Sequence, residues 1–76
     1  MLELIIMNEN KALFEGRARS VMLPGEQGVF ELLPYHKPLL SRLIGGKVII
    51  NNEQEFPVRR GIVGFNLNRA TVIVEE

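Results

Sequence analysis

The fold of this chain is decided by one central stretch, Leu23-Pro24-Gly25-Glu26-Gln27-Gly28-Val29-Phe30-Glu31-Leu32-Leu33-Pro34-Tyr35-His36-Lys37-Pro38-Leu39-Leu40. Proline fixes φ and glycine adopts conformations that other residues avoid, so residues 23–28 and 34–38 are predicted to be turns. The second turn holds the only histidine of the chain. The apolar runs beside these turns, residues 29–33 and 39–44, are predicted to be strands.

Outside this stretch, apolar residues recur with a period of two, as in Leu2, Leu4 and Ile6. This spacing is typical of a strand with one buried face. The segment from Lys37 to Leu43 also fits a short helix, with a stripe of Leu39, Leu40, Leu43 and Ile44, but Pro38 allows only a first helical turn, so a strand is favoured there. Further strands are predicted at residues 12–16, 47–51, 55–59, 62–67 and 70–75.

The breaks between these strands have the composition of turns. Asparagine, which tolerates the left-handed region, occurs in residues 8–10, 51–53 and 66–69. Gly45-Gly46 is predicted to be a hairpin turn, a tight reversal or bulge with positive φ, and Pro57 is predicted to lie on an edge strand or at a bulge. The sequence therefore predicts a single all-β domain over residues 1–76, a flattened two-sheet sandwich or barrel of about 8–10 short strands.

Length and composition narrow the function classes. The chain has 76 residues, no cysteine, and nine basic residues that balance nine acidic ones. No apolar run approaches the roughly 18 residues that span a membrane, and a net charge of zero creates no field that attracts nucleic acid or anionic lipid. Proteins are the expected partners.

The residues needed for catalysis are scarce. There is no aspartate, and one histidine stands near a single acid, Glu31, which is too little for a hydrolytic triad or a zinc site. We therefore predict no catalytic, cofactor-binding or metal-binding residues. The ring of His36 is expected to hydrogen-bond to the backbone and to order the loop from Pro34 to Pro38.

Two basic clusters leave an alternative function open. Arg17 and Arg19 have the spacing of neighbours on one face of a strand, and Arg59 and Arg60 are adjacent. A small β-barrel module that binds RNA or protein is therefore the second interpretation. The phenylalanines, however, occupy strand positions that a small core requires.

The chain resembles a known family in several blocks: the central stretch, Leu13-Phe14-Glu15-Gly16, Gly46-Lys47-Val48 and Gly61-Ile62-Val63. Together they resemble the amino-terminal β-sandwich domain of the epsilon subunit of F-type ATP synthases, and the likeness runs from Leu2 to Val74. The resemblance implies a non-catalytic rotor subunit of a proton-translocating synthase. Its expected partners are the gamma subunit and the rotor ring within the alpha, beta, gamma, delta and epsilon assembly, without nucleic acid. The expected location is the cytoplasmic face of the bacterial plasma membrane.

The resemblance also implies an interface. In the family the segment corresponding to residues 26–30 faces the polar loops of the ring, and the loop at residues 34–38 lies toward the same base and toward gamma. This chain departs from the family with Val29 in place of an acid, Glu31 in place of glycine, Tyr35 in place of a small residue or asparagine, and Lys37 in place of alanine. The predicted interface residues are Asn8, Glu26, Gln27, Val29, Phe30, Glu31, Tyr35, His36, Lys37 and Ser41.

The likeness covers the β-sandwich domain and no counterpart of the carboxy-terminal helical hairpin that many family members carry. In those members the hairpin inhibits ATP hydrolysis and in some cases binds ATP. For a chain that ends naturally at Glu76, we expect coupling and assembly without that inhibition and without a nucleotide site; a longer chain of which these residues are a part is the alternative.

Overall fold

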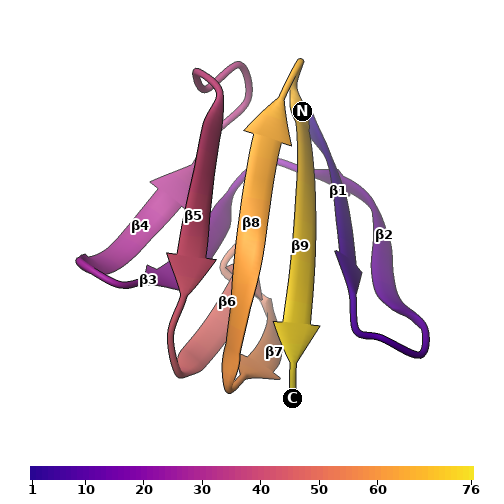
Figure 1. Ribbon diagram of the computed structural model, residues 1–76. Coiled ribbons are helices and arrows are strands. Elements are labelled where there is room, and N and C mark those ends of the chain that lie inside the picture. Colours follow the sequence, from indigo (N-terminus) through magenta and orange to yellow (C-terminus); the bar gives the residue numbers. More distant parts are fainter.

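A computed structural model describes all 76 residues and contains nine strands (Figure 1). No helix in it is long and apolar enough to cross a membrane. The strands are β1 (Leu2–Met7), β2 (Ala12–Ala18), β3 (Val21–Gly25), β4 (Gly28–Leu32), β5 (Leu39–Leu43), β6 (Gly46–Ile50), β7 (Gln54–Val58), β8 (Arg60–Asn66) and β9 (Arg69–Glu75). The predicted all-β fold is confirmed, and so is the choice of a strand over a helix at residues 39–44.

The nine strands form one continuous hydrogen-bonded sheet that curls on itself (Figure 1). Its order is β2-β1-β9-β8-β5-β3-β6-β7, and β4 pairs with β3 outside this path. All pairs are antiparallel except β1 with β9. The curl places β2, β1, β9, β8 and β5 in one half and β4, β3, β6 and β7 in the other, which agrees with the predicted sandwich closed toward a barrel.

The core lies between these halves and follows the period of two that the sequence shows. In β1, Leu4 pairs with Ala70 of β9 and Ile6 pairs with Val72, and all four residues are buried. Because successive side chains of a strand point to opposite faces, each strand contributes every second residue to the interior. Sixteen apolar residues form this core.

The chain changes from one half to the other at a corner, and this corrects the prediction for Gly45-Gly46. Both β5 and β6 run antiparallel to β3, so they do not form a hairpin with each other. Neither glycine has a positive φ, since Gly28 is the only glycine that does. Gly46 is needed because a Cβ there would lie 2.8 Å from Cβ of Pro24, so close packing at the corner excludes a side chain.

The turn predicted over residues 23–28 is also shorter than expected. Leu23, Pro24 and Gly25 belong to β3, and only two residues connect β3 with β4. Proline is tolerated in this strand because the carbonyl oxygen of Pro24 accepts a hydrogen bond of 2.8 Å from the N–H of Ile44, an arrangement that needs no proline N–H.

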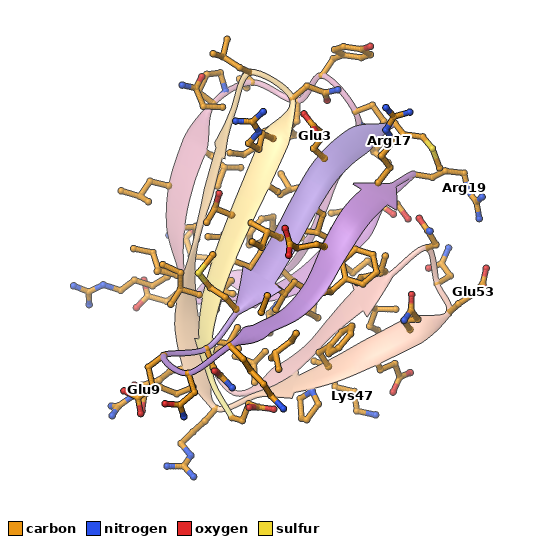
Figure 2. The ribbon with its side chains drawn as sticks, turned by 90° about the vertical axis from the view of Figure 1, so that its right-hand side faces the viewer. Glu3, Glu9, Arg17, Arg19, Lys47 and Glu53 are labelled. Carbon is orange, nitrogen blue, oxygen red and sulfur yellow. The ribbon has the colours of Figure 1, made fainter.

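Side chains rather than hydrogen bonds close the curl between β2 and β7. The rings of Phe14 and Phe56 meet edge to face with their centroids 6.3 Å apart. Figure 2 shows β2 beside β7 on this side of the molecule. Pro57 lies in β7, which pairs only with β6, so its prediction as an edge residue is confirmed.

Candidate functional site

The hairpin between β3 and β4 presents Glu26 and Gln27 at its tip, and both side chains are exposed. Gly28 has φ of 125°, a conformation that favours glycine. Gly25 is required for a different reason, because a Cβ there would lie 2.8 Å from the ring of Phe30. The two glycines thus hold a tight tip in contact with the Phe30 ring.

An open groove of about 620 Å³ lies between this hairpin and β5. It brings together five of the predicted interface residues, namely Glu26, Gln27, Val29, Phe30 and Ser41. Val29 is 67% exposed, whereas Phe30 is only partly exposed and packs against the core. The groove therefore exposes the apolar side chain of Val29 beside a polar hairpin tip.

Besides Gly25 and Gly28, three residues line this groove that the sequence did not lead us to predict. Leu39, Leu40 and Arg42 of β5 line it opposite the hairpin. Their signal was present, because a strand at residues 39–44 with period two places Leu40 and Arg42 on the face opposite to the buried Leu43.

In the loop from Pro34 to Pro38, the side chain of His36 makes the contact with the backbone that was predicted. Nδ1 of His36 lies 2.7 Å from the carbonyl oxygen of Lys37, which confirms the expected bond between the imidazole ring and the backbone. The ring of His36 also meets Phe65 edge to face, with centroids 6.0 Å apart. The histidine thus connects the loop to the edge of the core.

Tyr35 in the same loop has an unusual conformation. Its φ is 65°, and its residue is 81% exposed. A bulky residue in the left-handed region is strained, so the surrounding contacts must hold it there. The N–H of Tyr35 donates a hydrogen bond of 2.8 Å to Oδ1 of Asn68 in the β8–β9 turn.

Asn68 connects three segments and was missed as a site residue. Besides accepting the bond from Tyr35, its Nδ2 donates to the carbonyl oxygen of Met1 at 2.9 Å, and its own carbonyl accepts from the N–H of Glu3 at 3.0 Å. The neighbouring Leu67 has φ of 51° and is 90% exposed. Two strained apolar residues, Tyr35 and Leu67, therefore project from the same end of the sandwich.

The predicted interface residues do not form one patch. Asn8 lies in the β1–β2 turn, at the end of the molecule opposite to the β4–β5 loop (Figure 1). Its Oδ1 accepts hydrogen bonds from the N–H groups of Asn10 and Lys11 at 2.7 and 2.8 Å, and its Nδ2 donates to Glu76 at 2.7 Å. Glu31 and Lys37 are exposed and form no ion pair. The hydrogen bonds of Asn8 therefore stabilise the β1–β2 turn, away from the other predicted interface residues.

The outer face of the larger half-sheet carries apolar side chains. Ile62 of β8 pairs with Ile73 of β9, Ile73 pairs with Met7 of β1, and both isoleucines are exposed. Leu40 of β5, also exposed, lies over Gly64 on the same face. We call Leu40, Ile62 and Ile73 the outer apolar face.

The basic residues alternate with acidic ones. Arg19 lies beyond the end of β2 rather than beside Arg17 on the strand, and it pairs with Glu53 at 3.9 Å. Arg17 lies across from Glu3, which pairs with Arg69 at 3.4 Å (Figure 2). Arg17 is the only basic residue within β2, so no continuous basic stripe runs along this strand.

A further ion pair borders the outer apolar face. Nε of Arg60 donates to Glu75 at 2.7 Å. This hydrogen bond, together with the positive charge of Arg60, lowers the pKa of the Glu75 carboxyl below its usual value and raises the pKa of Arg60. Both groups are fully exposed, so the pair is screened by salt.

The family described as "ATP synthase, Delta/Epsilon chain, beta-sandwich domain" matches residues 1–76 of the chain. The chain belongs to this family. The match covers every strand, and the β-sandwich in the family's description agrees with the curled two-layer sheet. The resemblance noted from the sequence is thereby confirmed.

Curated relatives carry the same assignment. The ATP synthase epsilon chain of Chlorobaculum tepidum is 35% identical over 75 residues, which cover 93% of this chain and 85% of the relative. The epsilon chain of Chlorobium limicola is 32% identical, and the match covers 97% of this chain and 89% of the relative. That of Nitratiruptor is 36% identical, but only 60% of its length is covered. Epsilon chains are non-catalytic subunits of the ATP synthase complex, and the prediction of a non-enzyme agrees with this.

Two solved structures have the same fold. One is the central stalk and ring of the Tetrahymena thermophila mitochondrial ATP synthase, with a TM-score of 0.81 and 16% identity over 97% of this chain and 63% of that one. The other is from the Euglena gracilis mitochondrial ATP synthase, with a TM-score of 0.85 and 11% identity over 96% of this chain and 49% of that one. At these identities the likeness establishes the fold alone.

Proposed function

We propose that this chain is a non-catalytic rotor subunit in the central stalk of a proton-translocating F-type ATP synthase. In this role it binds the gamma subunit and the rotor ring at the cytoplasmic face of the bacterial plasma membrane and couples ion transport to ATP synthesis. The observation that carries the proposal is the family match over all 76 residues, because it includes every element that builds the surface.

Two features of the surface support binding to other proteins. The outer apolar face exposes three large aliphatic side chains on a rigid sheet, and the groove between the β3–β4 hairpin and β5 exposes Val29. Clustered apolar side chains with a polar rim are typical of protein interfaces. Following the family resemblance, we assign the groove to the ring side and the β4–β5 loop to both the ring side and gamma. We add that Ile62 and Ile73 of the outer apolar face contact gamma, whereas Leu40 borders the groove.

The proposal is tested by capture from native membranes in mild detergent, with a tag placed after Glu76 and a salt wash before mass spectrometry. We expect alpha, beta, gamma and ring subunits to remain bound. A folded, tagged chain that retains none of them would overturn the proposal. Salt-sensitive retention on polynucleotide without these subunits would favour the small β-barrel module that binds RNA.

A matched pair of variants tests the assignment of the outer apolar face. Ile73→Lys places a charge in the centre of this face, whereas Glu53→Lys places one in the exposed β6–β7 turn, in the other half of the sheet. We expect Ile73→Lys to reduce capture of gamma by about tenfold or more, since desolvating a charge in an interface is costly, and Glu53→Lys to leave capture unchanged. Equal capture by both variants would remove the outer apolar face from the interface.

A further inference from the structure

Gly64 stands in the middle of β8, a strand that has a neighbour on each side, β5 and β9 (Figure 1). It pairs with Leu40 of β5 and with Thr71 of β9, and the register is continuous through both pairs, so no bulge requires a glycine here. Its φ is not positive. A Cβ at Gly64 would meet nothing closer than Cδ1 of Leu40 at 3.8 Å. Nothing within the chain therefore requires glycine at this position.

A glycine inside a strand has a cost, because it is less stable there than alanine and leaves the main chain of the sheet uncovered. Gly61 in the same strand has an internal reason for this cost, since a Cβ there would collide with the carbonyl oxygen of Ile73. Where no internal reason exists, glycine inside a strand often marks a site where another molecule closely approaches the main chain. Gly64 thus indicates a contact with something outside the chain.

An open hollow of about 460 Å³ lies over Gly64 on the outer surface of the sheet. Its lining includes residues of β8, of β9 and of the turn between them, namely Asn66, Leu67, Arg69 and Thr71. Ile62 precedes Gly64 by two residues in β8, and Ile73 follows Thr71 by two residues in β9, so both isoleucines lie on the same face as the hollow. The hollow is therefore continuous with the two residues that we assign to gamma.

The chemistry of the hollow determines which side chain fits it. Its floor is the main chain of a central strand, whose N–H and C=O groups are used in the ladders with β5 and β9. Leu40, 76% exposed, borders the floor on one side. At one end, Asn66 and Arg69 pair across the strands, both are exposed, and the single hydrogen bond of Arg69 to Glu3 leaves other donors of its guanidinium free. The matching occupant has a flat apolar body and one oxygen that accepts a hydrogen bond.

We infer that Gly64 is the floor of a binding site for one tyrosine side chain of the gamma subunit. The ring lies on the main chain of β8, where a side chain at position 64 would stand, and contacts Leu40 and Thr71. Its hydroxyl oxygen accepts a hydrogen bond from Arg69. Aromatic rings cover glycines in this way within sheets, and tyrosine is enriched at interfaces because its body is apolar and its tip is polar. This inference rests on the proposed function and specifies how gamma is anchored.

Side chains placed at position 64 fill the hollow and test the inference. Gly64→Val should weaken the binding of purified gamma by about tenfold or more, the effect typical of losing an aromatic anchor, and Gly64→Ala should weaken it less. Gly16→Ala is the matched control, because Gly16 also lies inside a strand and a Cβ there would also meet one side chain, the ring of Phe14 at 3.4 Å. Strands β1 and β9 separate Gly16 from β8, so this variant should bind gamma as the native chain does.

A ring supplied by the chain itself tests the same site without relying on a less stable fold. Thr71 lies directly across from Gly64, so the ring of Thr71→Phe can cover the glycine from within the sheet and should not lower the stability of the free chain. Thr71→Val keeps the branched shape of threonine and leaves the glycine uncovered. We expect Thr71→Phe to bind gamma about tenfold more weakly than Thr71→Val does.

Hydroxyl-radical footprinting of gamma, with and without the native chain, identifies the occupant of the hollow. One tyrosine of gamma is expected to lose most of its reactivity in the complex and to keep it when the chain carries Thr71→Phe at a saturating concentration. A complex in which no tyrosine of gamma is protected contradicts the inference.

The remaining outcomes separate this inference from the rotor proposal. Equal binding of gamma by the native chain, Gly64→Val and Thr71→Phe overturns the tyrosine site and leaves the rotor proposal intact. Failure of the native chain to bind gamma at all refutes the rotor proposal. A dimer of the native chain that Gly64→Val abolishes also overturns the inference, because it assigns the hollow to a second copy, whose single tyrosine, Tyr35, is 81% exposed.

Discussion

The N–H of Tyr35 donates a hydrogen bond of 2.8 Å to Oδ1 of Asn68, although 33 residues separate them. The same asparagine side chain donates to the carbonyl of Met1. One amide group therefore joins the β4–β5 loop, the β8–β9 turn and the amino terminus at one end of the sandwich (Figure 1). This connection explains how Tyr35 is held at a φ of 65° while its ring is exposed.

Replacing Asn68 separates the contribution of its side chain from that of its backbone conformation. Asn68→Ala loses two hydrogen bonds and places alanine at a φ of 60°, so the free energy of unfolding should fall by about 2–3 kcal/mol. Asn68→Gly loses the bonds but tolerates the conformation and should cost about 1–2 kcal/mol. Urea denaturation of both variants measures this difference. Equal losses would mean that conformational strain contributes nothing at this position.

The backbone conformation of Tyr35 is expected to lower the stability of the fold, because a tyrosine at a φ of 65° is strained while its ring is exposed. Tyr35→Asn retains the N–H that bonds to Asn68 but better tolerates the left-handed region, so unfolding should require about 0.5–1 kcal/mol more free energy. Leu67→Asn, at a φ of 51°, is the matched variant in the neighbouring turn and should show a similar gain. Thermal denaturation tests both. A loss of stability in Tyr35→Asn would show that the ring makes stabilising contacts in the free chain.

The conformation of Tyr35 also shows which features of the fold a local sequence pattern cannot predict. Leu2, Leu4 and Ile6 predicted a strand because burial alternates locally, and the structure buries all three. The strain at Tyr35 could not be predicted, because it depends on Asn68, which is distant in sequence. Gly45-Gly46 was misjudged for a similar reason: a glycine pair suits a reversal, but Pro24, packed against Gly46 at the corner, determines its actual role.

The same limit applies to the candidate site. The hairpin tip at Glu26 and Gln27 was found because its flanking glycines are visible in the sequence. Leu40 and Arg42 were missed because a long-range contact, Leu43 of β5 with Gly25 of β3, places β5 beside that hairpin, and local composition does not show this contact. Asn8 was grouped with the loop at residues 34–38 by family resemblance, while the structure places the two at opposite ends.

The seam between β2 and β7 is expected to depend on one aromatic pair. Phe14 and Phe56 are half-buried, so truncating either to alanine should cost about 2 kcal/mol of unfolding free energy. A double-mutant cycle should give a coupling energy of about 0.5–1.5 kcal/mol, the range for edge-to-face rings. Additive losses would show that each ring packs on the core independently and that the seam is held by other contacts.

The pair of Glu75 with Arg60 predicts a small dependence of stability on pH. The hydrogen bond from Arg60 and its charge lower the pKa of Glu75 in the folded chain below the unfolded value of about 4.3. The resulting stabilisation is therefore present above the unfolded pKa and is lost as the pH falls through the folded pKa. The stability difference between the native chain and Glu75→Gln should shrink from pH 6 to pH 3 and also shrink in high salt. A difference that is constant across this range would show that the ion pair does not contribute.

Gly61 and Gly64 of β8 offer a test of packing between adjacent strands. A Cβ on Gly61 would collide with the backbone carbonyl oxygen of Ile73, whereas one on Gly64 would meet Cδ1 of Leu40 at 3.8 Å, an ordinary contact. Gly61→Ala must push β8 away from β9, and since backbone atoms cannot move aside as a side chain can, unfolding free energy should fall by about 2–4 kcal/mol. Gly64→Ala should change the free energy of unfolding by less than about 1 kcal/mol. Alanine lowers the conformational entropy of the unfolded chain relative to glycine, and the new methyl group packs under Leu40. The denaturant midpoints of the two variants measure these changes in stability. A similar loss of stability in both variants would mean that any replacement of glycine in β8 is destabilising, and that the close approach of Ile73 is not the cause.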